Sequence, residues 1–144
     1  MENKSIKETE ETIVEEFALF DDWMSKYEYI IELGKNLNLI EEKFKTDEYK
    51  VKGCQSQVWL TAELVNGKLF YKADSDAIIT KGIISLLIRV LSGQSPVEII
   101  NADMHFIDKI GLKEHLSPNR ANGLTSMVNH MKNFAKIYSK QNVN

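Results

Sequence analysis

Cysteine is nearly absent from this sequence, because Cys54 is the only one among 144 residues. A lone cysteine cannot form a disulfide within the chain, and it cannot supply the several thiolates that a structural zinc or iron–sulfur site needs. An unpaired cysteine is also typical of proteins of the reducing cytosol, so we expect a cytoplasmic protein. The chemistry left to Cys54 is that of a single thiol.

Long apolar runs and a surplus of positive charge are missing as well. No stretch reaches the roughly 20 apolar residues that a membrane-spanning helix requires. The formal net charge is -3, and no stripe of lysine and arginine suits the phosphates of a nucleic acid. The first eight residues lack the apolar core of a secretory signal. We therefore expect no membrane segment, no nucleic-acid partner and no secretory signal.

The composition that is present predicts one globular domain. The content of 43% hydrophobic and 27% charged residues is ordinary for a globular protein. At 144 residues the chain is long enough to bury a core without disulfides or metal ions. Neither an internal repeat nor a linker interrupts it. We expect a single domain over residues 1–144, with loose ends at about 1–5 and 140–144.

A pattern with a period of two residues predicts a small antiparallel sheet. In residues 57–65 apolar side chains alternate with polar ones, as in a strand with one buried face. Asn66-Gly67 is typical of a tight hairpin turn, so residues 68–73 should return beside this strand. With a short strand at 49–51 leading to the cysteine, the prediction is a three-stranded meander.

Helical spacing of apolar residues predicts helices around this sheet. One is expected over residues 6–20 and a second after the capping pair Asp21-Asp22. Residues 74–76 offer capping oxygens for a central, buried helix over residues 77–91. The fold class predicted from these elements is α+β.

Two serine–proline pairs predict further helix starts, since a capping serine followed by proline suits the first turn of a helix. They are Ser95-Pro96 and Ser117-Pro118. Residues 104–112 should form another short element. The helix that begins at Pro118 carries an apolar face, so we expect it to pack on the sheet.

The immediate neighbours of Cys54 bear on its reactivity. Lys50 and Lys52 place positive charge close to it in the sequence, which would favour the reactive thiolate. Gly53 allows a tight backbone turn just before it. The competing interpretation is a small buried side chain without chemistry, which is the common fate of a free cysteine.

The loop that holds the cysteine reads Gly53-Cys54-Gln55-Ser56-Gln57-Val58-Trp59. It resembles the active-site loop of the SufE family, sulfur-acceptor proteins that work beside a cysteine desulfurase in iron–sulfur cluster assembly. Other segments match the family in the same order and span roughly residues 23–127: Tyr29-Ile30-Ile31-Glu32-Leu33-Gly34-Lys35, Asp74-Ser75-Asp76-Ala77, Lys81-Gly82, His115-Leu116-Ser117-Pro118-Asn119-Arg120 and Gly123-Leu124. Separated matches in one order over most of the chain are specific, and the chain is identified as a member of this family.

The resemblance implies a SufE/IscU-like fold and a role in sulfur transfer. Cys54 would take persulfide sulfur from a cysteine desulfurase and relay it to iron–sulfur cluster assembly. The family's desulfurase partners carry the pyridoxal phosphate, so we expect no cofactor and no metal in this chain. It would be a persulfide carrier and desulfurase activator, not an autonomous enzyme. The expected partners are a SufS-like desulfurase and a SufBCD-like scaffold complex, with at most a weak homodimer.

The resemblance also places eight residues where they would support the loop or contact the partner. They are Gly53, Gln55, Ser56, Gln57, Trp59, Asp76, His115 and Arg120. Asp76 could instead cap the helix that follows it, and His115 is more readily explained by packing than by a hydrogen bond to the persulfide. Arg120 lies in the first turn of a helix, where the helix dipole disfavours a cation, so a specific partner is expected.

Three other functions compete with sulfur acceptance. A cysteine hydrolase or transferase would pair Cys54 with a histidine base, and His115 is the most plausible one. An iron–sulfur scaffold would need more cysteines than this chain has. An interaction module would bury an inert cysteine. The apolar Val51, Val58 and Trp59 around the thiol further suggest that Cys54 turns inward in the free protein and outward on partner binding.

Overall fold

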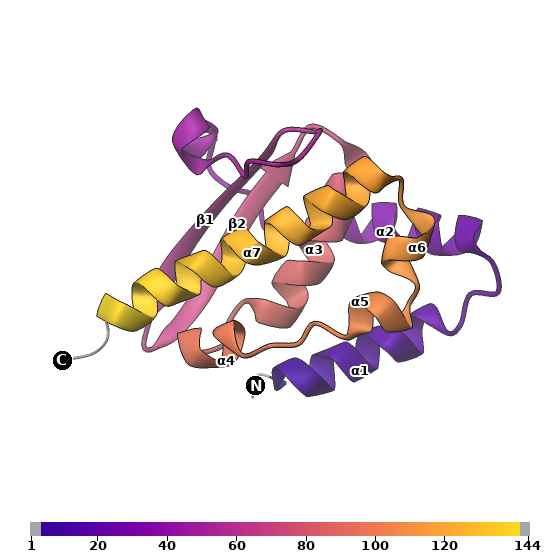
Figure 1. Ribbon diagram of the computed structural model, residues 1–144, viewed down its shortest axis with the longest axis horizontal. Helices are drawn as coiled ribbons and strands as arrows, with labels where there is room; N and C mark the ends of the chain where they lie inside the picture. The colour runs from indigo at the N-terminus through magenta and orange to yellow at the C-terminus, as the bar shows by residue number, and fades with distance from the viewer. Residues whose placement is uncertain (1–3, 142–144) are drawn as a thin grey trace.

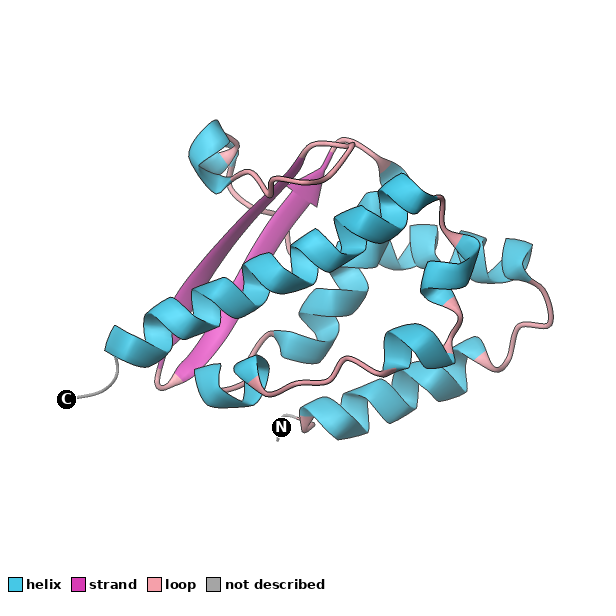
Figure 2. Ribbon diagram, viewed as in Figure 1, coloured by secondary structure: helices cyan, strands magenta, loops and turns pink. Residues whose placement is uncertain are grey.

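The computed structural model describes residues 4–141, which form helices packed around a two-stranded sheet (Figure 1, Figure 2). The α-helices are α1 Ile6–Phe17, α2 Trp23–Gly34, α3 Ile78–Leu91, α4 Pro96–Ile100, α5 Phe106–Lys109, α6 Leu112–His115 and α7 Pro118–Gln141. The strands are β1 Val58–Val65 and β2 Lys68–Ser75, preceded by the short 3-10 helices η1 Glu42–Phe44 and η2 Asp47–Tyr49. The predicted α+β class, a small antiparallel sheet packed on helices, is confirmed.

The two strands form the expected hairpin and are paired along their whole length. Asn66 and Gly67 make its turn with φ values of 53° and 78°, the left-handed angles that a tight turn between twisted strands requires. Leu60 and Leu69 are fully buried, whereas Glu63 is exposed. The alternation in the sequence therefore marks the face of the sheet that is turned to the core.

The third strand expected at residues 49–51 does not form, so the prediction of a three-stranded sheet is wrong. Tyr49 is the last residue of η2, and Gly53 turns the chain away with a φ of 90°. Between these two residues, Lys50 forms an isolated β-bridge with Trp59, and the N–H of Val51 donates to the carbonyl of Val58 at 2.8 Å. The segment between the 3-10 helix and the turn is too short for a strand.

The helix boundaries show which capping signals decide local structure. Asp22 caps α2 through the N–H of Ser25 at 2.7 Å, and Ser95 caps α4 in a reciprocal capping box with Glu98. The expected cap of α3 by residues 74–76 is wrong, because α3 begins after Ala77 without a side-chain cap. The first helix ends at Phe17 instead of residue 20. The N–H groups of Leu19 and Phe20 donate to carbonyls three residues earlier in the chain, as in a 3-10 turn, and not to carbonyls four residues earlier.

The long helix α7 packs on the sheet as expected. In Figure 1 it crosses in front of β1 and β2, and two tyrosines join it to them. The hydroxyl of Tyr71 donates to the carbonyl of Met131 at 2.7 Å, and the hydroxyl of Tyr138 donates to the carbonyl of Ala62 at 3.1 Å. Although α7 has 24 residues, no helix in the described part of the chain is long and apolar enough to cross a membrane.

The ends expected to be loose lie partly outside the described residues, which exclude 1–3 and 142–144. Within the described part, Ser5 forms a capping box with Glu8 at the start of α1. At the other end, Lys140 and Gln141 belong to α7. Helical structure therefore begins at Ile6, two residues after the start of the described chain, and continues to its end at Gln141.

Helices α2 and α3 approach each other closely because two glycines face each other at their crossing. A Cβ on Gly82 would overlap the carbonyl of Ile30, and one on Gly34 would lie 2.8 Å from the backbone nitrogen of Gly82. The hydroxyl of Ser85 donates to the carbonyl of Leu33 at 3.2 Å across the same interface. This contact fixes the position of α3, whose first turns lie beside the cysteine loop.

Replacing Gly82 by alanine tests this close contact. Gly82→Ala is expected to destabilise the protein by about 2–3 kcal/mol, because the added methyl group must push the two helices apart. The free energy of unfolding measured in urea reports the effect. Gly123→Ala is a matched control, since Gly123 is another buried helical glycine whose added Cβ would make ordinary contacts of 3.5 Å or more. Equal stability of the two variants would contradict the tight crossing.

Candidate functional site

The cysteine loop lies against α7 at the end of the sheet. Its two stems meet where the N–H of Val51 donates to the carbonyl of Val58. At its first bend Gly53 has a φ of 90°, and a Cβ there would lie 2.5 Å from Oγ of Ser126 on α7. The left-handed backbone favours glycine at this position, and a larger residue would also displace the hydroxyl of Ser126.

A set of hydrogen bonds fastens the second stem of the loop to the chain between β2 and α3. The carboxylate of Asp76 accepts from the backbone N–H of Gln57 at 3.0 Å and from its side-chain Nε2 at 3.4 Å. The carbonyl of Gln57 in turn accepts from the N–H of Asp76 at 3.2 Å and from the hydroxyl of Ser75 at 2.8 Å. Asp76 therefore holds the loop and leaves α3 without a side-chain cap.

Cys54 is half-buried between the loop, α3 and the first turns of α7. Its Sγ lies 3.6 Å from the carbonyl oxygen of Gly123, to which the thiol donates a weak hydrogen bond. Beside it is a cavity of about 10 Å³, which is close to the space that one water molecule needs. The cavity is lined by Cys54, Gln55, Ser56, Thr80, Ile83, Asn119, Arg120, Gly123 and Met127.

Burial raises the pKa of the Cys54 thiol above its ordinary value. Lys50 and Lys52 do not offset this effect, and the expectation that they favour the thiolate is wrong. Both lysines line a different hollow, together with Asp47 and Glu48 and with residues of α7. Neither lysine lines the Cys54 cavity, although both are close to Cys54 in the sequence.

The structure brings some of the other expected residues to the cavity and leaves others away from it. Gln55, Ser56 and Arg120 line the cavity. The guanidinium of Arg120 donates to the hydroxyl of Tyr27 at 3.1 Å. Trp59 does not line it, and the Lys45 ammonium lies 5.7 Å from the centre of its ring.

His115 is directed elsewhere. Its ring stacks on Trp23 with centroids 4.3 Å apart, and its Nδ1 lies 2.9 Å from the carbonyl oxygen of Gly111. The contacts of His115 are those of a packed side chain, as its sequence context favoured. The only charged side chain lining the Cys54 cavity, among the described residues, is that of Arg120. The cysteine hydrolase alternative therefore lacks its histidine base at this cavity.

Sequence reasoning missed several residues of the cavity wall. Thr80 and Ile83 come from α3, and Gly123 and Met127 come from α7. Gly123 lies in a segment that matches the SufE family, so its neighbourhood could have been noticed. Nothing in the local sequence distinguishes Thr80 from the rest of an apolar helix. In the described part of the chain, no group of three or more His, Cys, Asp and Glu side chains is placed to hold a metal ion.

The raised pKa of Cys54 predicts slow alkylation near neutral pH. The rate with iodoacetamide should rise with an inflection above about 8.5, the value of an unstructured cysteine, because only the thiolate reacts. The inflection is found by measuring the rate constant of alkylation in quenched time courses at a series of pH values from 6 to about 10.5. The urea-denatured chain serves as the control and should show the ordinary value. An inflection in the folded protein at or below that of the denatured chain would contradict the effect of burial.

The bonds between Asp76 and Gln57 predict that Asp76 restrains the thiol. Asp76→Ala removes both carboxylate bonds and should raise the alkylation rate of Cys54 severalfold, with a loss of stability of about 1 kcal/mol. Asp76→Asn is the matched control, because one side-chain oxygen is still available to the N–H of Gln57. An alkylation rate for Asp76→Ala equal to that of the wild type would show that the loop is held without this contact.

Comparison with known proteins gives a consistent result. The family model SufE, described as an Fe-S metabolism associated domain, matches residues 11–135. A SufE-like protein of Rhizobium meliloti is 43% identical over 129 residues, covering 86% of this chain and 92% of that relative. A SufE-like protein of Synechocystis is 40% identical over 131 residues, covering 91% of this chain and 82% of that relative. A match of this extent cannot rest on the cysteine loop alone.

Two further matches come from a plant and from a solved structure. SufE-like protein 1 of Arabidopsis thaliana, named chloroplastic/mitochondrial, is 42% identical over 120 residues, which cover 83% of this chain and 32% of the plant protein. The solution structure of a hypothetical protein from Thermus thermophilus has the same fold, with a TM-score of 0.73 and 19% identity over 89% of this chain and 93% of that one. On the strength of the family model and the relatives, this chain belongs to the SufE family, whose domain is associated with Fe–S metabolism.

Proposed function

We propose that this protein accepts persulfide sulfur on Cys54 from a cysteine desulfurase and passes it toward iron–sulfur cluster assembly. The observation that carries the proposal is the placement of the single cysteine of a SufE-family chain in a sheltered loop at the start of β1. A single thiol is all that this reaction asks of the acceptor.

The transfer is an exchange between two sulfur–sulfur bonds. The Cys54 thiolate attacks the outer sulfur of the persulfide on the donor's cysteine, and a new sulfur–sulfur bond forms on Cys54. The donor's sulfur–sulfur bond breaks, and its cysteine leaves as a thiolate that takes up the proton given up by Cys54. The number of electrons on sulfur is unchanged overall, so no external oxidant or reductant takes part.

The surroundings of Cys54 suit a carrier that protects its cargo. The cavity beside the thiol has room for about one water-sized group, so little solvent can reach the sulfur from that side. Its half-buried position limits the access of water and of oxidants to a persulfide held there. The same burial raises the pKa of the thiol, so the free protein is a weak nucleophile.

The reaction therefore requires a change at the loop when the donor binds. Turning Cys54 outward would expose it to water, lower the pKa of its thiol and bring it within reach of a partner's persulfide. The turn at Gly53 and the solvent-exposed bonds between Gln57 and Asp76 allow such a motion without disturbing the core. The donor would thus select the reactive form of the loop.

The remaining parts of the proposal concern the setting of the reaction. The chain holds no cofactor of its own, and the pyridoxal phosphate that breaks the carbon–sulfur bond belongs to a SufS-like desulfurase. The receiver is a SufBCD-like scaffold complex, and the place is the cytoplasm. The chain acts as a carrier and activator, not as an autonomous enzyme, and it forms at most a weak homodimer.

Incubation with a cysteine desulfurase and cysteine tests the proposal. The wild-type chain is expected to gain the mass of one or more sulfur atoms, detected by intact-protein mass spectrometry and removed by a reductant. Cys54→Ala should gain none, since it lacks the accepting sulfur. Its thermal unfolding checks that the fold is kept, and the half-buried thiol predicts only a small loss of stability.

The outcome against the proposal is equally definite. Equal sulfur gain by the wild type and by folded Cys54→Ala would move the acceptor elsewhere. No gain by the wild type with several cysteine desulfurases would leave Cys54 without this role.

A further inference from the structure

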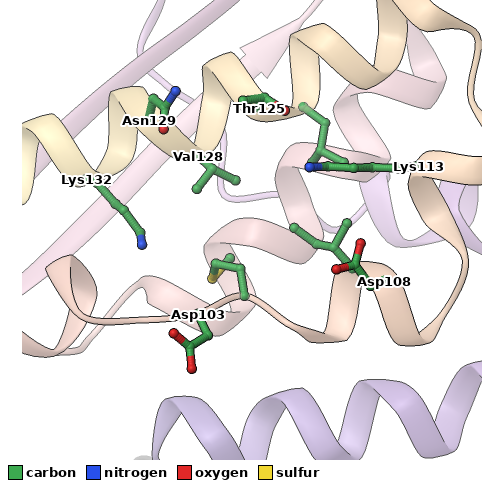
Figure 3. Close-up of a pocket in the computed structure, with 10 residues that line it drawn as sticks. Asp103, Asp108, Lys113, Thr125, Val128, Asn129 and Lys132 are labelled. Atoms are coloured by element: carbon green, nitrogen blue, oxygen red, sulfur yellow. The ribbon is translucent and has the colours of Figure 1, made fainter.

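A second cavity, shown in Figure 3, borders α7 and shares no lining residue with the Cys54 cavity. Its volume is about 150 Å³, the size of an engineered protein cavity that binds benzene. The floor is apolar and consists of Met104, Ile107, Leu124 and Val128, all of them buried except the half-buried Val128. The cavity therefore has space for a molecule of about the size of alanine.

Charged side chains of both signs surround this floor. Figure 3 shows Lys113 with Asp108 at one end of the cavity and Lys132 with Asp103 at the other. The ammonium of Lys132 is engaged, because it donates to the carbonyl of Ala102 at 2.5 Å. Within residues 4–141, the side chains of Asp103, Asp108 and Lys113 form no ion pair or hydrogen bond. Within this part of the chain, charges of both signs therefore line the cavity without a partner, as a site for a zwitterion requires.

The backbone under the cavity is held in a strained form. Met104 is buried and has a φ of 56°, a left-handed value that is uncommon for a residue other than glycine. The chain is tied on both sides of it, to α7 through Ala102 and to α1 where the N–H of Phe106 donates to the buried carboxylate of Glu10 at 3.1 Å. Strain of this kind persists where the surroundings enforce it, and it is concentrated at binding sites.

We propose that this cavity binds a small zwitterionic amino acid with a side chain no larger than that of alanine or cysteine. Asp108 faces the ligand's ammonium group and Lys113 faces its carboxylate. The short side chain rests on Val128 and Met104. The proposal does not depend on sulfur acceptance by Cys54, because the two cavities have no lining residue in common.

Titration of the reduced protein with L-alanine tests the site, since alanine has no thiol that could react with Cys54. Amide NMR shifts of Met104, Val128 and Asn129 should saturate with a dissociation constant of about 1 mM, as expected for a ligand with so few atoms. The turn at Asn66 and Gly67 should not shift. Acetate or ethylamine alone should bind at least about tenfold more weakly than alanine, because each lacks one of the two charges. A mixture of the two should be no better, because the charges are not linked, and leucine should bind as weakly because its side chain is too large.

Substitutions identify the groups that bind. Lys113→Gln and Asp108→Asn should each weaken alanine binding by about threefold, the effect of one partly exposed charge pair. The matched control is Lys109→Gln, an exposed lysine on α5 that does not line the cavity and should leave binding unchanged. Val128→Phe should fill the cavity and abolish binding, and an unchanged spectrum of the Asn66–Gly67 turn would show that this variant folds.

Three results would overturn the proposal. One is the absence of saturable shifts at Met104 and Val128 up to a concentration far above the expected constant. Another is equal binding of alanine and of acetate mixed with ethylamine. The last is equal weakening by Lys109→Gln and Lys113→Gln. Sulfur acceptance by Cys54 could still be present in each case, so failure of this site is distinguishable from failure of the proposed function.

Discussion

The attachment of Gln57 to the corner after β2 is the contact on which the placement of Cys54 depends. Four hydrogen bonds join Gln57 to Ser75 and Asp76, two through its carbonyl, one through its N–H and one through its side chain. The hairpin sets where this corner lies, because β1 and β2 are paired over their whole length. The corner also leads directly into α3, whose Thr80 forms part of the cavity wall. One small set of polar contacts thus links the sheet, the loop and the central helix.

Shelter and reactivity oppose each other at Cys54. A thiol between the loop and α7 is sheltered from solvent, yet the same burial disfavours the thiolate that the proposed sulfur transfer requires. Gly123 contributes to this state, because its carbonyl oxygen accepts from the thiol. Under the proposed function, a protein with this resting state would depend on its partner to expose the thiol, which would restrict the reaction to the productive complex.

The features that the sequence predicted correctly are those with a local cause. The turn at Asn66 and Gly67 and the capping box at Ser95 are fixed by residues within a few positions of one another. The failures have a longer range. Asp76 had a local role available as a helix cap, but its actual partner is Gln57, nineteen residues away. The charges of Lys50 and Lys52 were expected at the thiol, but in the structure both lysines line a different hollow.

Helix α7 borders both cavities, and this gives the two a common wall. Gly123 and Met127 face Cys54, while Leu124 and Val128 form the floor of the second cavity. These residues are neighbours on one helix and cannot move independently, because the backbone hydrogen bonds of the helix fix the distances between them. A displacement of the first half of α7 would therefore change the room beside the sulfur and the room above Met104 together. On the Cys54 side the sulfur itself contacts the backbone of the helix, because it lies 3.6 Å from the carbonyl oxygen of Gly123.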